Sequence, residues 1–145
     1  MKEANGMLSR LLRPKRVVRA HCDLPCGVYD PAQARIEAES VQKIQEKYQD
    51  AEAQKKPSET VEEFQTRCVL IKEHRADLVK HHLWVLWTDY FKPEHLERYP
   101  DLHDLFWRAT KAAGEAKKSA DPKQGQELLD LIGEIDKIFW ETKKG

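Results

Sequence analysis

The sequence predicts an all-α protein, and more specifically an antiparallel up-down four-helix bundle. Three observations support this prediction: helix-favouring residues fill four long segments, apolar residues recur there at helical spacing, and Pro-containing turns separate the segments. Consecutive helices joined by short turns pack as antiparallel neighbours around a shared core. With 145 residues, the chain can form one domain that buries a core without disulfides.

The first predicted helix begins at Pro31 and ends between residues 51 and 56. Asp30 is expected to cap it, because its carboxylate can accept a hydrogen bond from a free N–H of the first turn. Pro31 suits the first helical position, since that position needs no N–H donor. Pro57-Ser58 marks the break that follows.

The second predicted helix starts with a capping box, in which Thr60 and Glu63 satisfy each other's backbone N–H groups. It ends near Phe91-Lys92-Pro93, because proline disfavours helix in the residue before it. Steps of four and three along this helix predict a packed seam that includes two polar residues. The predicted seam consists of Phe64, Cys68, Ile71, Arg75, Leu78, His82 and Val85.

The third helix is predicted to start near Asp101 and the fourth at Asp121-Pro122. Both carry apolar residues at helical spacing, which predicts that each buries one face. The third helix contributes Leu102, Leu105, Phe106, Ala109 and Ala113, and the fourth contributes Leu128, Leu131, Ile132, Ile135, Ile138 and Phe139. No segment has the pattern of a strand.

The formal charge of zero is unevenly distributed. Residues 1–20 carry six basic groups and one acidic group, a net charge of +5, so the rest of the chain carries −5. A mildly acidic body argues against nucleic-acid binding, and no run of about 18 apolar residues predicts a membrane span. By composition, residues 1–20 fit a disordered tail, a transit peptide or a pro-segment.

The three cysteines are Cys22, Cys26 and Cys68. An odd number without a secretory signal argues against a disulfide framework and favours free thiols in a reducing compartment, so we expect a cytoplasmic protein. Cys68 lies on the predicted seam, where it would be a buried, apolar thiol.

The segment His21-Cys22-Asp23-Leu24-Pro25-Cys26-Gly27-Val28-Tyr29-Asp30 combines an imidazole with two thiols in a short loop. These donors suit a soft transition metal. They could also begin a zinc site, which would need a fourth ligand, or they could be a loop with two reduced cysteines. A di-iron bundle site is not expected, because none of the six histidines follows a glutamate by three residues.

This segment resembles the nickel hook of nickel-containing superoxide dismutases. The resemblance continues through residues 31–40, 71–73, 86–93 and 135–144, and covers most of residues 21–145. The stretch 49–62 departs from the family by being longer, at a predicted turn away from the hook. The resemblance implies an enzyme with antioxidant function that disproportionates superoxide to O₂ and H₂O₂ by Ni(II)/Ni(III) cycling.

The resemblance also implies processing, a ligand set and an assembly. A processing protease would cut Ala20–His21, making residues 1–20 a propeptide and residues 21–145 the hook and bundle. One nickel ion per subunit would bind the α-amino and imidazole nitrogens of His21, the amide nitrogen and thiolate of Cys22, and the thiolate of Cys26. Six identical subunits would form a homohexamer.

Four further site residues follow from the resemblance. Glu37 and Arg75 would orient the axial imidazole of His21 by hydrogen bonds. Tyr29 and Tyr90 would flank the substrate pocket. Two alternatives remain open at this point: a nickel or zinc carrier that uses the same hook, and a helical interaction protein with an Arg-rich tail.

Overall fold

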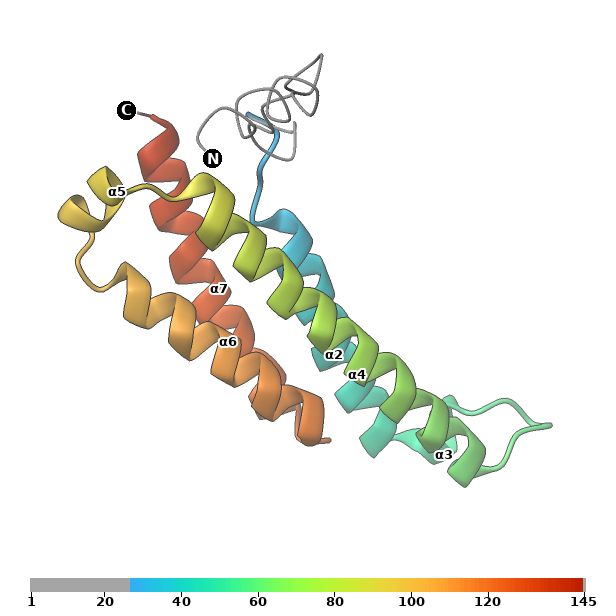
Figure 1. Cartoon of the computed structure of the whole chain (residues 1–145). Helices are drawn as coiled ribbons and strands as arrows, with labels where there is room; N and C mark the ends of the chain where they lie inside the picture. The colour runs from blue at the N-terminus through green and yellow to red at the C-terminus, as the bar shows by residue number, and fades with distance from the viewer. Residues whose placement is uncertain (1–26, 145) are drawn as a thin grey trace, which may run out of the picture.

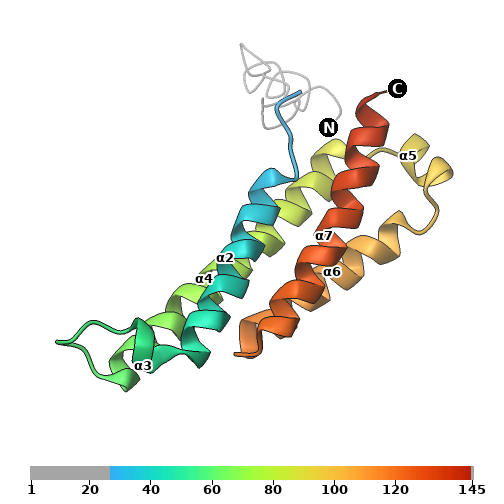
Figure 2. The same ribbon diagram turned by 180° about the vertical axis from the view of Figure 1, so that it is seen from behind.

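The computed structural model describes residues 27–144, and every regular element in that range is helical. Four long helices form the body: α2 (Ala32–Gln49), α4 (Val61–Val85), α6 (Leu102–Lys118) and α7 (Pro122–Lys143). Successive long helices run in opposite directions and lie side by side, so the predicted up-down four-helix bundle is confirmed (Figures 1 and 2). The predicted ligands His21, Cys22 and Cys26 and the Ala20–His21 bond lie outside the described residues.

Three short elements were not predicted as separate helices, although two of them lie within the ranges predicted for the first and second helices. The first is α3 (Ala51–Gln54), the second is η1 (Leu86–Tyr90), a π-helical turn that continues α4, and the third is α5 (Pro93–Arg98). None of the described helices is both long and apolar enough to cross a membrane.

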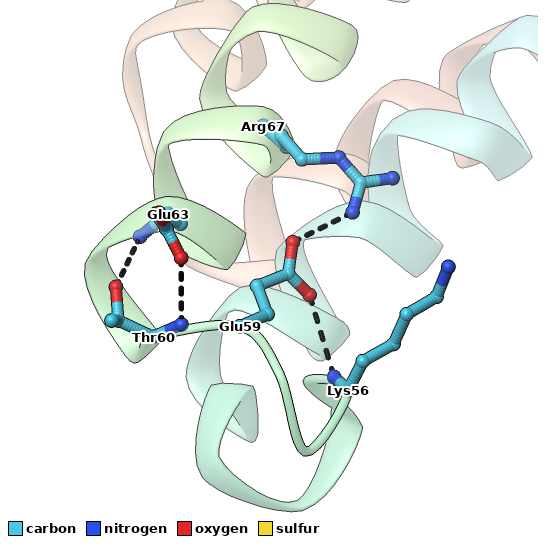
Figure 3. A network of polar contacts seen from close by, with 5 residues as sticks. All are labelled: Lys56, Glu59, Thr60, Glu63 and Arg67. Carbon is cyan, nitrogen blue, oxygen red and sulfur yellow. Dashed lines mark hydrogen bonds and ion pairs between the residues drawn. The ribbon is translucent and has the colours of Figure 1, made fainter.

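The predicted helix starts are confirmed, with one small shift. The α2 helix begins at Ala32, one residue later than predicted, so its N-cap residue is Pro31 and not Asp30. Asp30 nevertheless accepts a hydrogen bond from the Ala32 N–H at 2.7 Å. Thr60 and Glu63 form the expected capping box on α4 (Figure 3).

A polar cluster closes the connection between α3 and α4. Arg67 donates to Glu59 at 2.7 Å, and the Lys56 N–H donates to the other Glu59 oxygen at 3.4 Å (Figure 3). The hydrogen bond from Arg67 holds the pKa of Glu59 below its ordinary value. This connection falls within residues 49–62 and lies at the end of the bundle away from the start of α2 (Figure 1).

The predicted seam of α4 was wrong by one position after Cys68. The buried residues of α4 are Cys68, Lys72, Ala76, Val79 and Leu83. The predicted seam runs along one flank of this stripe, and Ile71 is 44% exposed. Small side chains explain the difference: α4 presents Ala76 to the core, and α2 buries Ala34 and Ala38 completely. A search for large apolar residues misses such a stripe.

The core also holds two buried polar side chains, Gln45 from α2 and Lys72 from α4. Both pack against the C-terminal end of α6. Gln45 donates to the carbonyls of Ala116 and Ser119, each at 3.1 Å. Lys72, only 4% exposed, donates to the carbonyls of Ala116 and Lys117. The last carbonyls of a helix lack partners and carry partial negative charge, so an amide and an ammonium stabilise them. Burial lowers the pKa of Lys72.

Candidate metal centre

Three chain segments meet at one end of the bundle. They are the start of α2 with residues 27–31 before it, the end of α4 with η1, and the end of α7 (Figures 1 and 2). Of the seven predicted site residues, Tyr29, Glu37, Arg75 and Tyr90 belong to the described part of the chain, and the structure brings them together in two pairs.

The first pair is Glu37 on α2 and Arg75 on α4. One guanidinium nitrogen, Nη1 of Arg75, lies 3.0 Å from both carboxylate oxygens of Glu37. The Glu37 side chain is 13% exposed and that of Arg75 is 40% exposed. A carboxylate that is mostly buried and charge-compensated in this way is held in one orientation, so it can in turn orient a donor that approaches it.

The second pair is Tyr29, just before α2, and Tyr90, at the end of η1. Their rings pack edge to face with centroids 6.5 Å apart. The Tyr90 hydroxyl lies 2.7 Å from Oγ1 of Thr142. Thr142 gives its single proton to the carbonyl of Phe139 at 2.7 Å, so Tyr90 is the donor. The Phe139 ring also packs against Tyr90, with the two ring centroids 4.3 Å apart, and so further fixes the tyrosine.

The π-helical turn η1 determines where Tyr90 points. The Phe91 N–H donates to the Leu86 carbonyl at 3.1 Å, a bond that spans five residues instead of four. Such turns insert an extra residue into a helix and are frequent at functional sites. Leu86 and Phe91 are buried on either side of the turn, which holds it in place.

A hollow of about 290 Å³ lies beside Tyr29. Tyr29 and Asp30 line one side of it, and His81 and His82 line the other. The sequence predicted His82 as part of the packed seam; the structure has His82 half-buried and its neighbour His81 exposed. Burial lowers the pKa of His82, the neighbouring His81 adds to this effect, and the carboxylate of Glu37 opposes it.

Lys143 in the last turn of α7 is a residue that sequence reasoning missed. Its Nζ lies 3.3 Å from the Gly27 carbonyl, 5.5 Å from the Tyr90 ring centroid and 5.3 Å from that of Phe139. A lysine in the last turn of a helix is ordinary, so its sequence position gave no signal of these contacts.

The donor set in residues 21–26 suits nickel, because thiolate and nitrogen ligands favour square-planar Ni(II). Among residues 27–144, no group of three or more His, Cys, Asp or Glu side chains is arranged to hold a metal. Cys68 is the buried, free thiol predicted, with 6% exposure, and burial raises its pKa.

Known proteins resemble the chain closely. Residues 16–143 match the family model described as nickel-containing superoxide dismutase. The nickel superoxide dismutase of Streptomyces coelicolor is 60% identical over 138 residues, which is 95% of this chain and 99% of that protein. The enzyme of Streptomyces seoulensis is 62% identical over the same shares of both chains.

Solved structures agree with this result. The native structure of a nickel superoxide dismutase superposes with a TM-score of 0.76 at 60% identity, covering 86% of this chain and 100% of that one. Variants solved by crystallography change a histidine at the first residue, an aspartate at the third and a tyrosine at the ninth. The chain therefore belongs to the nickel-containing superoxide dismutase family, and its activity is the nickel-dependent disproportionation of superoxide.

Proposed function

We propose that this chain disproportionates superoxide at a nickel ion held by residues 21–26, and that cleavage of the Ala20–His21 bond creates the site. The main support for this proposal is the spacing of three residues that follow the proposed cleavage site. The solved relatives have histidine, aspartate and tyrosine at their first, third and ninth residues, and His21, Asp23 and Tyr29 have the same spacing. Residues 21–145 make up 125 of the 145 residues, about 86% of the chain, and the native structure also covers 86% of this chain and 100% of its own.

Cleavage matters because of the nitrogen atom of His21. While Ala20 is attached, this atom is an amide nitrogen, which binds metals only after losing its proton. After cleavage it is an α-amine with a pKa of ~8, which coordinates readily near neutral pH. The resulting set is the amine and imidazole of His21, the amide nitrogen and thiolate of Cys22, and the thiolate of Cys26. Bound there, nickel supplies one-electron chemistry in both directions.

The net reaction consumes two superoxide anions and two protons. One superoxide loses an electron and leaves as O₂; the other gains an electron and two protons and leaves as H₂O₂. In this proposal the Glu37 carboxylate, held by Arg75 at 3.0 Å, accepts a hydrogen bond from the His21 imidazole and orients it. Arg75 offsets the negative charge that Glu37 brings to the site.

Tyr29 and Tyr90 restrict access to the metal in this proposal. Tyr90 donates its hydroxyl proton to Thr142, so its oxygen remains an acceptor for a water molecule or a protonated product. The rings of the two tyrosines pack edge to face with centroids 6.5 Å apart, and in this proposal that packing holds both rings in place beside the path of superoxide.

We also propose a homohexamer in the cytoplasm. Large apolar side chains are exposed on the isolated subunit, among them Trp84 at 53%, Trp107 at 56% and Trp140 at 43%, and contacts between subunits would cover such residues. A reducing compartment keeps the thiols of Cys22 and Cys26 free for the metal. The mass of the native protein beginning at His21 tests the assembly, and a fully active monomer would contradict it.

The function itself is tested by metal analysis and a superoxide assay on protein that begins at His21. We expect one nickel per chain and rapid loss of superoxide, with Cys22→Ser as the inactive control. Nickel binding without superoxide loss would support the carrier alternative instead. Failure to bind any metal would support a helical interaction protein.

A further inference from the structure

We propose that Lys143 is a positioning residue, which fixes the base of the metal-binding segment and the ring of Tyr90 at the same time. This inference rests on the proposed function. Lys143 is exposed and lies in the last turn of α7, more than one hundred residues along the chain from the segment it contacts.

The first contact is with the backbone next to a predicted nickel ligand. Nζ of Lys143 donates to the Gly27 carbonyl at 3.3 Å, and Gly27 directly follows Cys26. Gly27 has a φ of +92°, a conformation that side chains disfavour and that glycine adopts freely. Residues 27 and 28 form a turn, and the lysine holds the Gly27 carbonyl of this turn.

The second contact is with Tyr90. The ammonium lies 5.5 Å from the Tyr90 ring centroid and 5.3 Å from that of Phe139, within the range of a cation–π interaction. The adjacent Thr142 accepts the Tyr90 hydroxyl proton. Two consecutive residues of α7 thus contact Tyr90: Thr142 binds its hydroxyl and Lys143 lies over its ring. Lys143 also binds the Gly27 carbonyl.

The neighbouring residue provides a matched control. Lys144 carries the same charge and is also exposed, but it makes no hydrogen bond or ion pair within residues 27–144. If charge at the end of α7 were all that mattered, substitutions at the two positions would have equal effects. If position matters, only Lys143 will affect the segment that begins at Gly27.

The test compares Lys143→Met, Lys143→Arg and Lys144→Met in protein that begins at His21. In the metal-free proteins, the ¹³C chemical shift of the Gly27 carbonyl reports on the hydrogen bond that it accepts. In the nickel-loaded proteins, the rate of nickel loss to a chelator and the activity at low and high salt are measured. We expect Lys143→Met to move the Gly27 shift and to lose nickel ~10-fold faster, in the range for residues that support metal ligands.

Lys143→Arg should recover part of the nickel retention, since it keeps a charged donor, and Lys144→Met should match the parent protein in all three measurements. An unchanged Gly27 shift and nickel-loss rate in Lys143→Met would overturn the proposal. A loss of activity confined to low salt, with normal nickel retention, would also overturn it, because Lys143 would then only attract superoxide. Should the parent protein neither hold nickel nor remove superoxide, the proposed function fails, while the metal-free Gly27 measurement still decides the contact.

Discussion

Arg75 and Glu37 form an ion pair in which one guanidinium nitrogen lies 3.0 Å from both carboxylate oxygens. The pair joins α4 to the first half of α2. The two side chains are unequally buried, Glu37 at 13% exposure and Arg75 at 40%. Losing the arginine therefore leaves a charge that water cannot reach well, whereas losing the carboxylate leaves a cation that water can solvate.

This asymmetry predicts unequal effects on stability. Arg75→Met should lower the free energy of unfolding by about 1–3 kcal/mol, because it leaves a mostly buried carboxylate without its partner. Glu37→Gln should cost less, and both should reduce activity about 10–100-fold if the pair orients a metal ligand. Urea unfolding measures the first effect. Arg108→Met, which breaks the exposed pair with Asp104, is the control and should change little.

The three cysteines should separate into two kinds. Cys22→Ser and Cys26→Ser should abolish nickel binding, because a serine hydroxyl stays protonated and is a poor nickel ligand. Cys68→Ser should keep nickel and activity and cost only ~1–2 kcal/mol of stability, from burying a hydroxyl in place of a thiol. Metal analysis of each variant checks this. Loss of nickel in Cys68→Ser with retention in Cys26→Ser would refute the ligand assignment.

His82 should make stability depend on pH on the acid side. Burial and His81 lower its pKa in the folded chain, so as the pH falls below the unfolded value of ~6.5, the unfolded chain binds a proton first. The contribution of neutral His82 to the free energy of unfolding is therefore complete above the pKa of the unfolded chain. It declines as the pH falls from there towards the lower pKa of His82 in the folded chain. His82→Gln should flatten this decline in urea unfolding between pH 5 and 7. The exposed neighbour His81 provides the control. His81→Gln should keep most of the dependence of the unfolding free energy on pH.

Two glycines of α7 should respond in opposite directions to alanine. A Cβ on Gly125 would lie 2.6 Å from Oε1 of the buried Gln45 and 2.7 Å from Cβ of Gln42, so α7 would have to move away from α2. A Cβ on Gly133 would meet nothing within 4 Å. We expect Gly125→Ala to destabilise the protein by about 1–3 kcal/mol through overpacking. Gly133→Ala should stabilise it by roughly 0.5–1 kcal/mol through better helix propensity, and equal effects would contradict the close approach of the two helices.

Local patterns predicted most of the fold. The capping box at Thr60, the helix start at Asp121-Pro122 and the apolar faces of α6 and α7 are all present, because these features depend on residues a few positions apart. The α4 stripe was misplaced, since it depends on how closely α2 approaches. The π-turn before Phe91 could not be predicted, because it is stabilised by packing at the end of α4 and by no local sequence signal.

The candidate site divides in a similar way. Glu37 and Arg75 were predicted from resemblance, and the structure shows that they meet. Thr142 and Lys143 were missed because each is unremarkable within its own helix. Their contacts with Tyr90 and Gly27 arise only when the end of α7 packs beside η1 and the segment before α2.

In the proposed function, cleavage before His21 creates the metal site. The most direct measurement compares the full-length chain with protein beginning at His21, each given nickel under reducing conditions, with the intact N-terminus confirmed by mass. We predict tightly held nickel and superoxide dismutase activity only in the protein beginning at His21, because only that protein has a free α-amine next to Cys22. Equal nickel content and equal activity in the two proteins would show that cleavage is not needed to form the site.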